Sequence, residues 1–212
     1  MNATRQLRQS DASRGSLPGP IPSIDAAMLA RSAADRDAVL AEIRQACVQT
    51  GFFCLDNLLR QSAAYSNVLG HMHHFFALPD DDSRKRAIDV TGQDNTNGWM
   101  PLFQEPAYQP GTIAHLESFD CGRPAGSRND PSHRANRWPD IEGFRQDVRA
   151  LWDELSEAGW DVMRAVADVL ALDTDFFVAR CDSQELSTMR LLHYPPNDAA
   201  ASDDSSVGIA LS

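Results

Sequence analysis

The sequence predicts an α+β fold in which helices come first and strands gather close to residue 212. Two stretches carry apolar residues at the 3.6-residue spacing of a helix, over residues 35–50 and 139–170. A third stretch, LSTMRLLHY at 186–194, reads instead as a strand, and VGIA begins a second strand at Val207. Helices segregated from strands in this way are typical of an α+β architecture.

Composition narrows the class of partner. The 212 residues carry a formal net charge of -11, which disfavours nucleic acid because phosphate binding depends on Lys and Arg. No stretch approaches the roughly 18 apolar residues needed to cross a bilayer, so no membrane partner is expected either. The four cysteines show no zinc-type spacing, and no secretory h-region is visible. We therefore expect a soluble, cytoplasmic protein with reduced thiols.

The first elements follow from local signals. Residues 1–20 are rich in Arg, Ser, Gln, Gly and Pro and predict a disordered tail. Pro22 restricts the residue before it, so 21–25 is expected to be extended. The helix predicted over 35–50 stops at Gly51. Its expected buried face follows an i, i+4, i+8 spacing and consists of Val39, Ile43 and Cys47.

The middle of the chain is predicted to contain a strand and a helix, followed by two loops. GFFCLDN at 51–57 reads as a buried strand, and a second helix is predicted over 60–77, ending near Pro79. Its candidate core residues are Tyr65, Val68, Leu69, Met72 and Phe76. Residues 91–112 and 122–136 predict loops because they are polar and rich in turn-forming residues. The aromatic residues of the first loop either line a substrate entrance or cover the core: Trp99, Phe103 and Tyr108.

The longest predicted helix spans about 139–170. Pro139 suits a first helical turn, and Asp140 and Glu142 complement the positive end of the helix dipole. Its apolar stripe comprises Phe144, Val148, Leu151, Leu155, Val162, Val166 and Val169. A shorter helix is predicted at 174–181, before the strand at 186.

Two histidine patterns raise the question of a metal. His115 and Glu117 have the His-x-carboxylate spacing of a metal triad, with His193 as a third ligand further along the chain. A lone pattern of this kind arises by chance more often than it binds metal, so no metal ligand is predicted. A second group lies on the 60–77 helix without a carboxylate or cysteine at a matching spacing, and is interpreted as packing: His71, His73 and His74.

Five segments, taken in order, carry a family resemblance over about residues 21–210: IPSID, QTGFFCLDN, HHFFALPDDDSRKRAI, HLESFDC, and MRLLHYPP with VGIA. Together they resemble the iron(II)/2-oxoglutarate-dependent oxygenases of the isopenicillin-N-synthase-like type. The resemblance implies a helical N-terminal region, a long support helix and a double-stranded β-helix, or jelly-roll, core. It also implies that Fe(II) is held by a His-x-Asp pair and a distant His, and that 2-oxoglutarate is gripped by an Arg-x-Ser pair.

The resemblance assigns few site residues to this sequence. After a VGIA-like strand the family continues Pro-His-Thr-Asp, but this sequence has Leu211 and Ser212 there. No catalytic residue and no metal ligand is therefore assigned. In the family's Asn-x-Tyr-x-Pro-like pattern the Tyr contacts 2-oxoglutarate; Tyr194 matches that Tyr, whereas Leu192 replaces the Asn. Alternation along the strand places Arg190, Leu192 and Tyr194 on one face.

These observations give an expected organisation. Residues 1–20 form a tail, 21–122 an N-terminal dioxygenase-like domain, 123–185 a linker loop and support helices, and 186–212 the first strands of the core. We expect a truncated family member that is inactive alone and binds neither Fe(II) nor 2-oxoglutarate firmly, whose full-length relatives oxidise small molecules with 2-oxoglutarate and O2. A fragment or a frameshifted product of a gene that encodes a full, active oxygenase is one alternative. Another is a non-catalytic binding or scaffold protein that self-associates through exposed strand edges.

Overall fold

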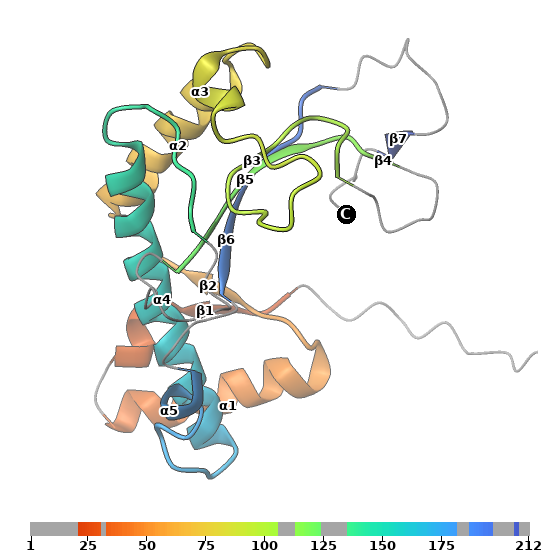
Figure 1. Cartoon of the computed structure of the whole chain (residues 1–212). Coiled ribbons are helices and arrows are strands. Elements are labelled where there is room, and N and C mark those ends of the chain that lie inside the picture. The colour runs from red at the N-terminus through yellow and green to blue at the C-terminus, as the bar shows by residue number, and fades with distance from the viewer. Residues whose placement is uncertain are drawn as a thin grey trace, which may run out of the picture.

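The computed structural model describes residues 21–30, 33–105, 113–123, 135–181, 187–196 and 206–207. Within these ranges, helices are combined with small sheets, which confirms the α+β class (Figure 1). The 1–20 segment and the end of the second predicted strand lie outside the described residues. No helix in the described ranges is both long and apolar enough to cross a membrane.

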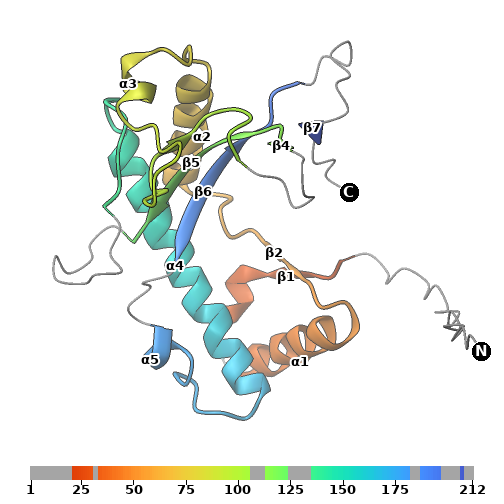
Figure 2. The same cartoon turned by 45° about the vertical axis from the view of Figure 1, so that its right-hand side comes forward.

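The longest element is α4 (Phe144–Val169), whose 26 residues extend about 39 Å. It runs along one side of the molecule beside α2 at one end and α1 at the other (Figures 1 and 2). Its N-terminal half contributes Phe144 and Val148 to one hydrophobic core, whereas Ala165 belongs to a second core. The predicted support helix therefore joins two separately packed regions.

The start of α4 differs from the prediction. The helix begins at Phe144, not at Pro139, because Gly143 adopts a left-handed φ of 77° that no right-handed helix contains. Ile141 and Phe144 donate backbone hydrogen bonds to Pro139 and Ile141 in the turns before it. A side chain at position 143 would also meet His71, since the imidazole lies 3.5 Å from an ideal Cβ there.

The second core lies beneath β1 (Ser23–Asp25), η1 (Ala26–Ala30) and α1 (Ala33–Gln49). β1 pairs in parallel with β2 (Cys54–Asp56). From residue 35 onward, the buried residues of α1 are Val39, Ile43 and Ala46, whereas Cys47 is exposed, so that part of the predicted face was wrong. The i, i+4, i+7 spacing follows the true helical period more closely than i, i+4, i+8.

The first core lies between helices and an antiparallel sheet of order β3-β5-β6. The strands are β3 (Trp99–Met100), β5 (Glu117–Gly122) and β6 (Thr188–His193). The helices are α2 (Ala63–Phe76), which begins after the Ser62 cap, and the N-terminal half of α4; the short α3 (Ser83–Arg86) follows α2 along the chain. Tyr65 and Leu69 of α2 are each 38% exposed, so they are not core residues as predicted.

Within the described ranges, three strands appear where none was predicted: β3, β5 and a two-residue strand at 113–114. β3 interrupts the predicted 91–112 loop, and β5 places strand in the middle of the chain, well before residue 186. Phe119 of β5 lies fully buried, with its ring centroid 5.1 Å from that of Phe144. The sheet is therefore built from segments far apart in sequence, and the order "helices, then strands" is only partly correct.

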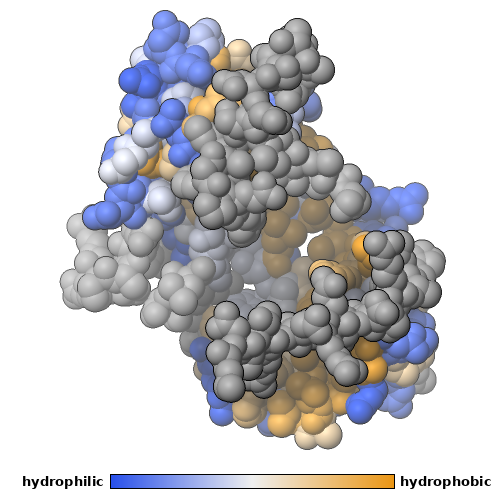
Figure 3. Space-filling view, turned by 90° about the vertical axis from the view of Figure 1, so that its right-hand side faces the viewer, coloured by the Kyte–Doolittle hydropathy of each residue, from blue (hydrophilic) through white to orange (hydrophobic). Residues whose placement is uncertain are grey.

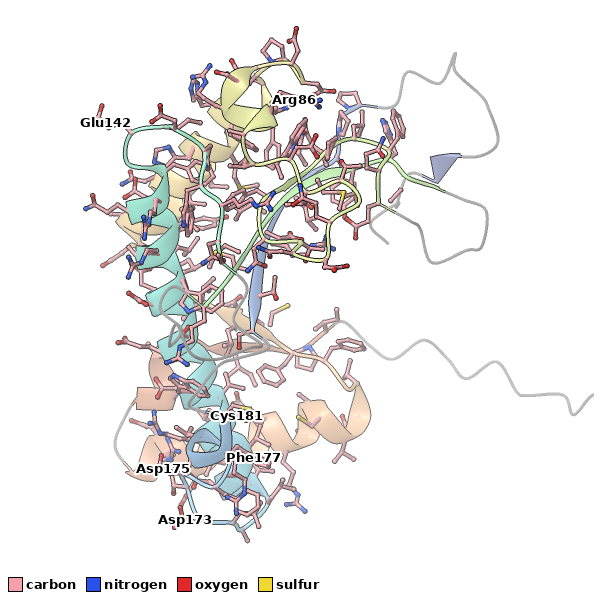
Figure 4. All side chains as sticks on the ribbon, viewed as in Figure 1. Arg86, Glu142, Asp173, Asp175, Phe177 and Cys181 are labelled. Carbon is pink, nitrogen blue, oxygen red and sulfur yellow. The ribbon has the colours of Figure 1, made fainter. Side chains whose placement is uncertain are left out.

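The remaining elements are short. β4 (Ile113–Ala114) pairs in parallel with β7 (Ser206–Val207), so the chain near residue 206 returns beside the start of β5. α5 (Val178–Cys181) forms only the second half of the helix predicted at 174–181. Figure 4 shows Asp173, Asp175, Phe177 and Cys181 grouped at the α5 end of the molecule, away from Arg86.

A polar clasp joins α2 to the first turn of α4. His71 Nε2 lies 2.9 Å from Asp147 Oδ2, and the Asn67 amide donates to Oδ1 at 3.2 Å. Both hydrogen bonds lower the pKa of Asp147 below its usual value, and the one with His71 has the larger effect. The histidine that was interpreted as packing thus lies against a carboxylate, at side-chain exposures of 17% and 23%.

We predict that Asp147→Asn lowers the free energy of unfolding by up to about 1 kcal/mol at pH 7. A carboxyl whose pKa is lowered by folding stabilises the fold above its unfolded pKa of about 4, and this contribution is lost as pH falls through the lower folded value. Urea denaturation from pH 7 down to about pH 2 should show the two proteins converging at the acid end. Exposed Asp153 of the same helix supplies the control, Asp153→Asn. A pH-independent difference would contradict the assignment.

Candidate functional site

The β5–β6 pair presents two chemically different faces. Glu117 pairs with His193 and Asp120 with Arg190, so the predicted alternation of β6 is confirmed. We call the face bearing Glu117, Phe119, Leu191 and His193 the rear face; it turns toward the first core. We call the opposite face, with Ser118, Asp120, Arg190 and Leu192, the front face. Continued alternation puts Tyr194 on the front face.

The front face carries an ion cluster centred on Arg190. Its guanidinium donates from Nε to Asp120 Oδ1 at 2.9 Å, and from Nη1 and Nη2 to the two oxygens of Glu105 at 2.9 and 2.8 Å. Nη2 also lies 3.4 Å from the Ser118 hydroxyl. The cluster fastens the segment around Glu105 to β5 and β6, using the bidentate geometry that arginine favours.

The cluster combines one guanidinium with two carboxylates. Burial raises the pKa of Asp120, because desolvation of the carboxylate outweighs the attraction of Arg190. Hydrogen bonds to Asp120, and secondly to Glu105, raise the pKa of Arg190 against the opposing effect of burial. Two carboxylates therefore occupy the three nitrogens of Arg190, which makes this arginine a structural tie and not a receptor for a further anion.

Tyr194, the residue matched to the 2-oxoglutarate contact, lies directly beyond β6. It is 39% exposed, and its phenol forms no hydrogen bond with the described part of the chain. Its neighbour on the front face, Leu192, offers no polar group at the position where the family pattern has Asn. A phenol placed in this way can donate one hydrogen bond to a ligand oxygen.

The rear face holds a buried polar network around Glu117, which is 5% exposed. Its Oε2 accepts from Trp99 Nε1 at 2.8 Å and from Lys85 Nζ at 3.1 Å. Its Oε1 lies 2.8 Å from His193 Nδ1. The Lys85 ammonium, 1% exposed, also lies 3.4 Å from both Asp80 Oδ1 and the Phe76 carbonyl oxygen. Sequence reasoning missed this network, although Lys85 is the only lysine in the chain.

Aromatic rings enclose the same network. Lys85 Nζ lies 4.8 Å from the centre of the Trp99 ring, a cation–π distance. Phe76 stacks on His193 at 5.2 Å with an interplanar angle of 23°. Trp99 is fully buried, so of the two interpretations offered for the loop aromatics, core cover applies to it. Tyr108 lies outside the described residues.

These residues do not fit an iron(II) site. Both oxygens of Glu117 already accept hydrogen bonds, and His115 is 8% exposed and stacks on Phe103 at 5.1 Å and 8°. Among the residues that the structure describes, no group of three or more His, Cys, Asp or Glu side chains could hold a metal ion. His115, Glu117 and His193 thus lie in packing and hydrogen-bonding roles. The absence of an assigned metal ligand stays a prediction.

An apolar groove of about 770 Å³ lies beside the sheet, between α4, the β2–α2 connection and the start of β6. Its walls include Leu58, Trp152, Leu155, Met163 and Met189. Figure 3 looks toward this side of the molecule and shows apolar residues gathered in a hollow between the sheet and α1. Leu155, predicted to be core, is 37% exposed here. Glu142, just before α4, lies at the opposite end of the molecule from Cys181, which belongs to the groove lining (Figure 4).

Comparison with known proteins gives a consistent result. Residues 21–141 match the family model described as the non-haem dioxygenase in morphine synthesis N-terminal region. The 2-oxoglutarate-dependent dioxygenase citB of Monascus ruber is 30% identical over 174 residues, covering 76% of this chain and 51% of that protein. Isopenicillin N synthase of Streptomyces clavuligerus is 30% identical over 190 residues, covering 82% and 55%.

Solved structures show the same relationship. A putative 2OG-Fe(II) oxygenase family protein from Caulobacter crescentus has a TM-score of 0.69 at 28% identity, covering 85% of this chain and 58% of that one. A full-length protein of Neurospora crassa, solved in complex with alpha-KG, has a TM-score of 0.69 at 25% identity, covering 85% and 56%. The chain spans about half the length of the curated relatives it matches. It belongs to the isopenicillin-N-synthase-like family of 2-oxoglutarate- and iron(II)-dependent oxygenases.

Proposed function

We propose that this chain supplies the N-terminal domain and first core strands of an oxygenase that oxidises a small organic molecule with O2 and 2-oxoglutarate. Family membership supports the reaction class. The proposed division is a tail at 1–20, an N-terminal domain at 21–122, a linker with support helices at 123–185, and core strands at 186–212. The Neurospora crassa relative is also described in complex with alpha-KG and thymine, which supports a substrate of similar size.

The observation that carries the proposal is the front face of β6. Arg190 is tied to β5 and to Glu105, so the strand is held firmly just before Tyr194. Tyr194 is 39% exposed beyond that tie, and its phenol makes no hydrogen bond to any residue that the structure describes. A fixed strand ending in an available phenol suits the role of orienting a carboxylate or keto oxygen of 2-oxoglutarate.

The 212 residues alone are not expected to carry out the reaction of the family. Because the donors described here do not fit iron(II), the 212-residue chain is expected not to turn over 2-oxoglutarate. The iron ligands of the whole enzyme would then come from outside the described residues. A location in the cytoplasm, with neither membrane nor nucleic acid as partner, completes the proposal.

The first test measures turnover by the purified chain. The protein is incubated aerobically with iron(II), 2-oxoglutarate and ascorbate, and succinate is quantified; a full-length oxygenase of the family serves as positive control. We expect succinate at the level of protein-free buffer and no stoichiometric iron after equilibrium dialysis. Iron-dependent succinate formation above that level would contradict the proposal that this chain is inactive alone.

The second test concerns Tyr194. Tyr194→Phe removes a single hydroxyl and should weaken 2-oxoglutarate binding from a few-fold to about tenfold, the effect of one hydrogen bond. Binding is followed by backbone amide ¹H–¹⁵N shifts during titration, a readout that all three proteins retain. Tyr65 is exposed to a similar extent, 38%, so Tyr65→Phe is the matched control and should leave binding unchanged. Equal affinities for all three proteins would remove Tyr194 from the site.

A second candidate function is self-association through the sheet edge. β6 ends the order β3-β5-β6, and the described residues place no strand on its other side, where the apolar groove opens. Unpaired edges recruit complementary strands. This arrangement favours a binding or scaffold role without catalysis.

Light scattering after size-exclusion chromatography tests this candidate. If β6 recruits a second copy, the wild-type mass should rise above that of a 23.3 kDa monomer as concentration increases. Leu192→Lys puts a charge on the edge strand and should restore the monomer. The control is Leu170→Lys, at a 56% exposed position beyond α4. A monomeric wild-type protein at every concentration would eliminate self-association.

A further inference from the structure

We propose that Glu117 is a positioning residue that fixes the tautomer of His193 and thereby seats the end of β6. The link to a ligand rests on the proposed function, because Tyr194 is the next residue along the chain. The link to His193 rests on geometry alone. The Glu117 carboxylate on the rear face would therefore determine the orientation of the Tyr194 phenol on the front face.

The hydrogen bonds to Glu117 have a fixed direction. Trp99 Nε1 is an obligatory donor and lies 2.8 Å from Oε2, and the Lys85 ammonium donates to the same oxygen at 3.1 Å. A glutamate side chain at neutral pH is a carboxylate, which has no hydrogen to give. The 2.8 Å contact between Oε1 and His193 Nδ1 therefore needs its proton on the imidazole nitrogen.

The state of the other ring nitrogen follows from this direction. In a neutral imidazole one nitrogen carries the proton and the other is an acceptor, and the partner of one nitrogen decides which. With Nδ1–H donated to Glu117, Nε2 of neutral His193 keeps its lone pair. Stacking against Phe76 at 5.2 Å opposes rotation of the ring that would exchange the two nitrogens. The histidine side chain is 38% exposed, so this acceptor is within reach of solvent or a ligand.

The strand pairing connects the rear face to the front. Glu117 and His193 form the last cross-strand pair at this end of β5 and β6, and Tyr194 follows at once. A slip of one residue would exchange the faces of every side chain in the strand. Arg190 prevents that slip from the front face through Asp120, and His193 prevents it from the rear face through Glu117. The exit of β6 is therefore fixed on both sides.

Among the described residues, the charged side chains around Glu117 and His193 are those of Lys85 and Asp80. Lys85 faces Glu117 and, from the α2–α3 connection, Asp80 at 3.4 Å. Phe76 and Trp99 supply aromatic surfaces to His193 and Lys85. The lysine therefore acts through Glu117, since its hydrogen bond occupies Oε2 and leaves Oε1 to accept from Nδ1. Asp147, the carboxylate partner of His71, is the matched pair elsewhere in the fold.

The test uses the whole 212-residue chain labelled with ¹⁵N, in long-range ¹H–¹⁵N spectra of the imidazole rings above their titration range. We expect wild-type His193 to carry its proton on Nδ1. In Glu117→Gln the amide can donate to Nδ1, so the proton should move to Nε2 and the Tyr194 ring resonances should shift. Asp147→Asn should alter the His71 spectrum and leave that of His193 unchanged. Circular dichroism establishes that each variant is folded.

Two results would overturn the inference. One is a wild-type His193 protonated on Nε2, which needs no variant and so stands even if Glu117→Gln does not fold. The other is a folded Glu117→Gln in which His193 and Tyr194 are unchanged. The readout contains no 2-oxoglutarate, so it separates this inference from the proposed function. If the tautomer is as expected but the ligand leaves Tyr194 unperturbed, the positioning role holds and the 2-oxoglutarate assignment fails.

Discussion

The first core depends on the hydrogen bonds and the ion pair that the buried carboxylate of Glu117 forms. An ionised group at 5% exposure must be neutralised and hydrogen-bonded, and Lys85, Trp99 and His193 together do so. Removing one partner of such a pair usually costs about 3–5 kcal/mol, because the remaining charge stays buried. The three donors come from α3, β3 and β6, so a single side chain specifies how three distant segments meet.

The long helix α4 connects the first core to the second core. α4 contacts the first core through Phe144 and the second through Ala165, which places α1 and β1 relative to the sheet. Its N-terminal end is fixed by Gly143 and by the contact between His71 and Asp147. The groove beside β6 is lined by the part of α4 that lies between the two cores. Leu155 and Met163 of this part belong to neither core.

The longer helices α1, α2 and α4 could be predicted because their apolar stripes are local, as with Val39 and Ile43 or Phe144 and Val148. The alternation of β6 also predicted correctly that Arg190 and His193 lie on opposite faces. β5 could not be predicted, because its buried Glu117, Ser118 and Asp120 resemble a loop until their partners are known. Those partners are distant in sequence: Trp99 lies 18 residues from Glu117, and Arg190 lies 70 residues from Asp120. The candidate site depends on such pairings, so the sequence named Tyr194 only through the family resemblance, and the role of this residue stays a prediction.

Lys85 also makes the first core observable by chemical labelling. It is the only lysine in the sequence, and its amine is 1% exposed between Glu117 and the Trp99 ring. A lysine-selective acylating reagent therefore meets no accessible ε-amine while α3 stays packed against β5. Its rate of reaction reports how often that junction opens, much as amide exchange reports local opening of the backbone. The residue that neutralises the core is also an intrinsic probe of its breathing.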